Sequence, residues 1–127
     1  MTVTKKFIKM CEKAVNVQEV WQPKQFDCYY AKLLKRNFIL AELSSMNVIE
    51  KYIYNYIYLP TCEQSRKMSG LSWWKFDEEC NIVRRCFLED PLCEIDIETK
   101  EEAAICVVMR GYGKFWNGKD WVSQKEL

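Results

Sequence analysis

The chain has 127 residues, of which 49% are hydrophobic and 29% charged, and its formal net charge is +1. This length is typical of one domain with its own core, and the apolar content excludes wholesale disorder. No apolar run reaches the roughly 20 residues needed to span a bilayer, and the N-terminal segment lacks the apolar stretch of a secretory signal. We therefore expect a single intracellular domain over residues 1–127, with no membrane as partner.

The first predicted element is a helix over residues 4–15. Thr4 is a suitable N-cap, and the spacing of the apolar residues that follow is that of one helix face. These residues are Phe7, Ile8, Cys11, Ala14 and Val15. Pro23 prevents the helix from continuing past Trp21.

Residues 28–43 fit either one helix or two strands. Ala, Leu and Lys favour a helix, and Leu34, Phe38 and Ala41 would share one helical face. The adjacent Tyr29-Tyr30 and Phe38-Ile39 pairs favour a pleated surface instead. We predict two strands, over residues 28–34 and 38–43, joined around residues 35–37.

Tyrosines alternate with other residues over residues 51–60, before Pro60. Period two predicts a strand over residues 52–58 with the tyrosines on one face and the aliphatic residues on the other. Such a row beside Lys32, Lys35 and Arg36 could stack the bases of a nucleotide or a single strand. The alternative is a face covered by helices, with only the hydroxyl groups reaching water. The tyrosines are Tyr52, Tyr54, Tyr56 and Tyr58.

Three helices are predicted after Pro60. Thr61 to Gln64 fits a capping box and opens a short helix that stops at Ser69-Gly70. Ser72 opens an amphipathic helix, and Thr99 to Glu102 opens a helix to Arg110 that is apolar all round and should be the most buried. The inner stripe of the amphipathic helix is Trp73, Phe76, Cys80, Val83 and Phe87.

The aromatic stretch from Tyr112 to Val122 predicts a closing hairpin. Gly111 suits a left-handed helix C-cap, and the Asn117-Gly118 pair tolerates the positive φ of a tight turn. Four aromatic residues could form a stacking platform, but a two-stranded hairpin is marginal alone. We therefore predict that it packs as a clasp on the helix before it. Together these elements predict an α+β fold: a small antiparallel sheet, two to four helices and the hairpin.

The sequence contains no histidine, which excludes Ser-His-Asp and Cys-His catalysis, histidine metal sites and the usual neutral-pH proton shuttle. The number of cysteines, seven, is odd, and the sequence shows no export signal. We therefore expect reduced thiols and no disulfide framework. Cys80, Cys86 and Cys93 are close enough in sequence for a metal site, but small core residues explain them better. We predict no metal and no cofactor.

Charge is unevenly divided along the chain. Residues 1–60 hold nine Lys and Arg against five Asp and Glu, whereas residues 61–127 hold ten against thirteen. Ten carboxylates lie between Asp77 and Glu102. They could steer a basic partner, or they could be the solvated sides of two helices. The clusters at residues 77–79 and 101–102 lie near helix N-termini, where acidic residues stabilise the dipole, so a carboxylate enzyme is the third and weakest alternative.

Three blocks resemble a group of small uncharacterised bacteriophage and prophage proteins. Trp21-Gln-Pro23 and Leu59-Pro60 match two of its positions, and Thr99 to Met109 and Tyr112 to Val122 match its acidic capping turn and its "YGKxWNGxxWV" ending. The match over residues 24–51 is loose, and Cys62 and Ser65 interrupt a Gln/Glu-rich helix. The resemblance implies a phage setting in the host bacterial cytoplasm and no particular catalytic or binding residue.

The expected function is binding without catalysis. We expect an accessory protein that occludes a host protein, as inhibitors of host defence do, because the usual catalytic side chains are absent, residues 77–102 are acidic and the ending is phage-like. We expect Glu94, Asp96 and Glu98 to contact that partner. The alternative is a binder of nucleotides or single-stranded nucleic acid that uses the tyrosine face, and self-association is left open.

Overall fold

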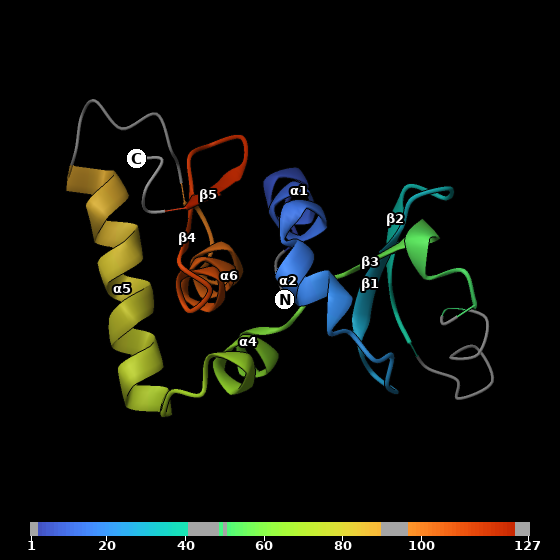
Figure 1. The fold of residues 1–127 in the computed structure, drawn as a ribbon, viewed down its shortest axis with the longest axis horizontal. Coiled ribbons are helices and arrows are strands. Elements are labelled where there is room, and N and C mark those ends of the chain that lie inside the picture. The colour runs from blue at the N-terminus through green and yellow to red at the C-terminus, as the bar shows by residue number, and fades with distance from the viewer. Residues whose placement is uncertain (1–2, 41–48, 50, 90–96, 124–127) are drawn as a thin grey trace.

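The computed structural model describes residues 3–40, 49, 51–89 and 97–123, and of residues 86–89 the backbone only. The described residues form an α+β fold in which helices lie beside a small antiparallel sheet (Figure 1). The elements are α1 (Lys5–Lys13), α2 (Val15–Glu19), β1 (Cys28–Ala31), β2 (Arg36–Ile39), the 3-10 helix η1 (Ile53–Asn55), β3 (Tyr56–Tyr58), α4 (Cys62–Ser69), α5 (Trp73–Glu89), α6 (Lys100–Arg110), β4 (Lys114–Trp116) and β5 (Trp121–Ser123).

Helix α6 is the centre of the core, as its apolar sequence predicts. Every residue from Glu102 to Met109 is buried, and α1, α4, α5 and β4 all pack against the helix. Helix α5 covers it on one side, and α1 and α2 separate it from the sheet (Figure 1). A helix contacted on all sides needs no polar face, which is why its sequence is apolar all round.

Threonine side chains cap three of the helices. Thr4 accepts a hydrogen bond from the backbone N–H of Phe7, so the predicted start of α1 is confirmed. The capping box at Thr61 is also confirmed, because Gln64 reaches back to the N–H of Thr61. At α6 only half of the predicted box forms: Thr99 accepts from the N–H of Glu102, whereas the Glu102 carboxylate accepts from the N–H of Glu98.

The sheet has the strand order β2-β1-β3, with both pairs antiparallel. The choice of strands for residues 28–43 is confirmed, but the predicted bounds are wrong. Strand β1 ends at Ala31, and β2 already begins at Arg36. Lys35 closes the turn with a φ of 53° and donates its N–H to the carbonyl of Ala31 at 2.8 Å, so the turn occupies residues 32–35. Residues 41–43 lie outside the described residues.

The predicted strand over residues 52–58 is wrong for its first half. Only Tyr56–Tyr58 is a strand, and residues 53–55 form η1. The reason is the partner strand: β1 ends at Ala31, which pairs with Tyr56, so earlier residues have no strand to pair with. The four tyrosines therefore share no face: Tyr52 and Tyr54 are exposed, Tyr56 is half-buried, and Tyr58 is buried.

The outer edge of β3 is closed by a side chain. The Gln18 amide accepts from the N–H of Tyr58 at 2.8 Å and donates to its carbonyl at 2.9 Å. These are the two hydrogen bonds that a further strand would make. Gln18 therefore satisfies the edge of β3 and joins α2 to the sheet.

The C-terminal hairpin packs as a clasp on the helix before it, as predicted, since β4 contacts α6. Trp116 is buried, and the indole N–H of Trp121 donates to the carbonyl of Met10 in α1 at 2.9 Å. The predicted left-handed Gly111 is wrong, since its φ is −61°. The chain reverses instead at Gly113, with a φ of 74°, and the turn of the hairpin places Gly118 at 96°.

Candidate binding surfaces

Helix α5 presents two adjacent tryptophans at its first turn. Its inner side buries Phe76, Cys80 and Val83 in the core, as the amphipathic pattern predicts. Trp73, expected on the inner stripe, is partly exposed and lies under the Arg66 guanidinium, 5.0 Å from its ring centroid. Trp74 is 75% exposed. A large aromatic side chain in this position contributes little to the core and is available to a partner.

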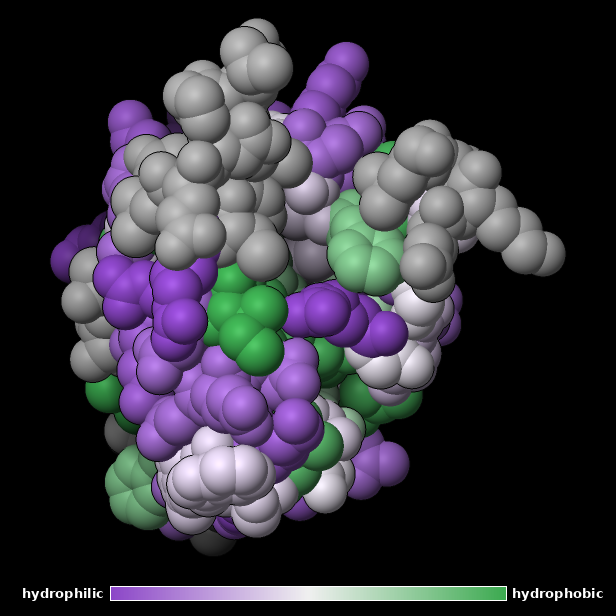
Figure 2. All heavy atoms as spheres, turned by 90° about the vertical axis from the view of Figure 1, so that its left-hand side faces the viewer, coloured by the Kyte–Doolittle hydropathy of each residue, from purple (hydrophilic) through white to green (hydrophobic). Residues whose placement is uncertain are grey.

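The acidic residues 77–79 of α5 lie beside basic side chains of the fold. Asp77 lies 3.2 Å from the Lys100 ammonium, and Glu78 and Glu79 lie 3.4 Å from that of Lys75. Arg110 also reaches Glu79 at 3.4 Å. These pairs support the interpretation of the cluster as a solvated helix side. The face of the molecule that carries α5 is mainly hydrophilic, with hydrophobic residues in small separate groups (Figure 2).

Of the three predicted partner-binding carboxylates, the structure describes that of Glu98. Glu94 and Asp96 lie outside the described residues. The Glu98 side chain is exposed, but its carboxylate lies 3.5 Å from the Lys6 ammonium. Glu98 therefore has a contact with α1 as well as access to solvent.

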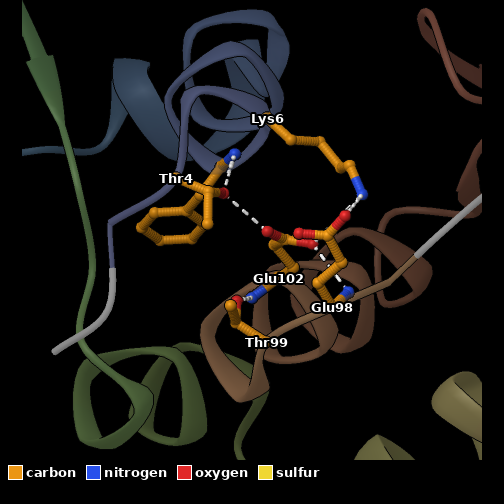
Figure 3. Close-up of polar contacts among 6 residues, drawn as sticks. Thr4, Lys6, Glu98, Thr99 and Glu102 are labelled. Carbon is orange, nitrogen blue, oxygen red and sulfur yellow. Dashed lines mark hydrogen bonds and ion pairs between the residues drawn. The ribbon is translucent and has the colours of Figure 1, made fainter.

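Beside Glu98 lies the fully buried carboxylate of Glu102 (Figure 3). It accepts from the hydroxyl of Thr4 at 2.6 Å and from the backbone N–H of Glu98 at 3.0 Å. The Lys6 ammonium is 3.7 Å away. The Thr4 hydroxyl thus caps α1 and bonds to α6 at once. With its oxygens engaged and no access to solvent, Glu102 ties the two helix starts together and is not placed to meet a substrate.

The opposite end of the molecule presents apolar and basic side chains together. Leu33 and Leu34, in the turn between β1 and β2, are 81% and 64% exposed, and Tyr54 of η1 is 89% exposed. The N–H of Lys32 donates to the carbonyl of Asn55 at 3.0 Å, which holds the turn against η1. The expected proximity of the tyrosines to Lys32 is thus found for Tyr54, whereas Tyr58 stacks on Trp21 in the interior.

A groove of about 620 Å³ runs beside this end, between α2 and β3. It is lined by Ile53, Tyr54 and Tyr56 of η1 and β3, and by Val15 and Trp21 of α2 and the segment after it. Glu12 and Lys32 also line it and form an ion pair at 3.6 Å. The groove has the volume of a small-molecule site, but Glu12 and Lys32 pair with each other and the Gln18 amide is engaged by backbone groups.

The described cysteine thiols are poorly suited to nucleophilic chemistry. Burial raises the pKa of Cys80 to about 12, and it also raises the pKa values of the Cys11 and Cys106 thiols. The thiolate is the reactive form, so these groups are unreactive near neutral pH. Among the described residues, no group of three or more His, Cys, Asp or Glu side chains is placed to hold a metal ion. Cys93 and the Cys86 side chain lie outside this description.

These pKa values predict a loss of stability in alkali. The folded pKa of Cys80, about 12, lies above the ordinary value of 9.0, so the unfolded chain loses this proton first. The contribution of the protonated Cys80 thiol to the free energy of unfolding is complete below about pH 9, and it falls as the pH rises toward 12. Urea denaturation at pH 8 and pH 10.5 should show a lower midpoint at the higher pH, and an unchanged midpoint would contradict this reading.

No helix among the described residues is long and apolar enough to cross a membrane. Comparisons with protein-family models, curated proteins and solved structures find no match to this chain. What the protein does must therefore be inferred from its own surfaces.

Proposed function

We propose that this protein is a non-enzymatic accessory protein of a bacteriophage or prophage that binds a protein of the bacterial host and blocks it, as inhibitors of host defence do. The observation that carries the proposal is Trp74, which is 75% exposed beside Trp73 at the start of α5. The phage setting comes from the resemblance of the C-terminal sequence motif.

The chemistry of the α5 face favours a protein as partner. Over residues 73–85 its side chains carry three positive and three negative charges, so they give the face no net charge to attract a nucleic acid. Protein interfaces are enriched in Trp, Tyr and Arg, and their energy is concentrated in a few such anchors. Trp74, with Trp73 and Arg66 beside it, fits an apolar socket with a polar rim on the partner.

Two observations support binding without catalysis. The carboxylates at residues 77–79 are held in ion pairs, and the carboxylate of Glu102 is buried and hydrogen-bonded. The buried thiols remain protonated because burial raises their pKa values. General acid–base or nucleophilic chemistry needs a group that is both accessible and poised near the working pH.

Capture from a host lysate tests the proposal. Immobilised wild-type protein should retain a host protein, and Trp74→Ala should retain it at least tenfold more weakly, since interface anchors contribute about 2 kcal/mol or more. Tyr54→Ala, which removes an exposed aromatic side chain from η1 at the opposite end of the molecule, is the matched control and should capture normally. Retention of the same proteins by wild type and Trp74→Ala would refute the role of α5.

The acidic residues Glu94, Asp96 and Glu98 remain a proposed second part of the contact. Charge reversal of these residues should weaken capture of the partner. Because Glu98 also pairs with Lys6, the charges of Glu94 and Asp96 should be reversed together in one variant and that of Glu98 in a separate one. The alternative ligand, a nucleotide or single-stranded nucleic acid, keeps only Tyr52 and Tyr54 as exposed aromatic contacts, because the four-tyrosine face does not form.

A further inference from the structure

The turn between β1 and β2 forms a compact surface that the proposed function does not use. We call residues 32–36 together with Tyr54 the cationic tip. Its sequence is Lys-Leu-Leu-Lys-Arg, and all five of these side chains are exposed. Two adjacent leucines, 81% and 64% exposed, are costly to keep in water, because each would gain free energy on transfer to an apolar medium.

Backbone hydrogen bonds hold the leucines outward. Lys35 donates its N–H to the carbonyl of Ala31 at 2.8 Å, which closes the turn. Lys32 donates its N–H to the carbonyl of Asn55 at 3.0 Å, which fixes the turn to η1 and brings Tyr54 beside it. The apolar residues are therefore presented by a fixed turn and not by a free loop end.

The charge around the leucines selects an anionic target. Lys35 and Arg36 follow them, Lys32 precedes them, and Lys51 lies 5.6 Å from the ring centroid of the nearby Tyr52. Among the described residues, the carboxylate of Glu12 approaches Lys32 at 3.6 Å, and no ion pair is found there for Lys35 or Arg36. The sheet and η1 lie at the end of the molecule opposite α5 (Figure 1), so a negative surface reached by the tip leaves the α5 face clear.

The leucines distinguish between anionic targets. A nucleic acid is bound by stacking on aromatic rings and by phosphate contacts, and neither uses two adjacent exposed aliphatic side chains. An anionic bilayer uses all three residue types: leucine enters the acyl boundary, tyrosine lies at the interface, and lysine and arginine remain at the phosphates.

We propose that the cationic tip attaches the protein to an anionic phospholipid surface, with Leu33 and Leu34 inserted below the headgroups. Attachment of this kind is peripheral and needs no spanning helix. It departs from the expectation of no membrane partner, which rested on the absence of a spanning segment and of a secretory signal from the sequence. It is also independent of host-protein binding, because Trp74 lies on the other end of the molecule.

Vesicle sedimentation tests the proposal with vesicles of equal parts phosphatidylcholine and phosphatidylglycerol, compared with phosphatidylcholine alone. Wild-type protein should sediment with the anionic vesicles and much less with the neutral ones. The Leu33→Ser/Leu34→Ser variant should bind at least tenfold more weakly, given roughly tenfold per buried leucine. Lys35→Glu/Arg36→Glu should also lose binding, and added salt should weaken the wild type.

Trp74→Ala is the matched control, because it removes an exposed apolar side chain from the far end, and it should sediment like the wild type. Circular dichroism should show the same melting temperature for all variants, since the changed side chains are exposed. Equal binding by the wild type and the leucine variant, or no binding to anionic vesicles, would overturn the proposal. So would tighter binding of a single-stranded oligonucleotide than of vesicles, which would assign the tip to nucleic acid.

Discussion

Replacing Glu102 with alanine is expected to lower the free energy of unfolding by about 3–5 kcal/mol. The carboxylate is fully buried and accepts from the Thr4 hydroxyl and the Glu98 N–H. Its removal leaves the N–H of Glu98 and the hydroxyl of Thr4 without this acceptor and opens a cavity at the start of α6. Urea denaturation followed by circular dichroism measures the loss.

Glu102→Gln separates hydrogen bonding from packing. It keeps the volume and one acceptor oxygen, so it should cost less than alanine, about 1–3 kcal/mol. Thr4→Ala removes one donor and the α1 cap together and should cost about 1–2 kcal/mol. A Glu102→Ala protein as stable as the wild type would show that the buried carboxylate does not hold the two helix starts together.

Replacing Asp27 with alanine is expected to cost about 3–4 kcal/mol, the second largest effect. Asp27 is buried, and three donors converge on its carboxylate: the Trp21 indole at 3.0 Å, the Lys24 N–H at 2.9 Å and the Gln64 amide at 2.7 Å. The same Gln64 closes the capping box of α4. Asp27 thus joins the segment before β1 to the start of α4.

Asp27→Asn is the informative comparison. It preserves the shape and one acceptor oxygen, which can still accept from Trp21 and Lys24, but its amide N–H₂ then faces the Gln64 amide, so part of the loss should remain. Tryptophan fluorescence should change for Asp27→Ala, in which the Trp21 indole loses its acceptor while it stays stacked on Tyr58. If Asp27→Asn and Asp27→Ala both unfold at the wild-type urea concentration, the three hydrogen bonds contribute little to stability.

The helices that begin at a threonine cap were predictable because their signals are local, whereas the break at Ala14 and helix α2 after it were not predicted. Thr4, Thr61 and Thr99 precede apolar periodicity within a few residues, and the structure places a cap at each. The tyrosine strand was not predictable from its own alternation, because its length is set by where β1 ends. The hydrogen bonds of Glu102 and Asp27 were also not predictable from the sequence. Thr4 and Glu102 are 98 residues apart, and no spacing rule connects them.

The candidate surfaces were predictable in part. Trp74 follows the inner stripe of α5 by one position, which on a helix points it away from the core, so its exposure could have been read from the sequence. The exposure of the Leu33-Leu34 pair was not predicted, because the predicted strand extended to residue 34. The actual turn at residues 32–35 exposes both leucines, and only the structure shows that η1 lies beside it.

The most direct test of host-protein binding uses the captured host protein in purified form. Its affinity should be measured by titration calorimetry for the wild type, for Trp74→Ala and for Leu33→Ser/Leu34→Ser. The predicted result is a loss of at least tenfold for Trp74→Ala and an unchanged affinity for the leucine variant. An unchanged affinity of Trp74→Ala would contradict the assignment of partner binding to the α5 face.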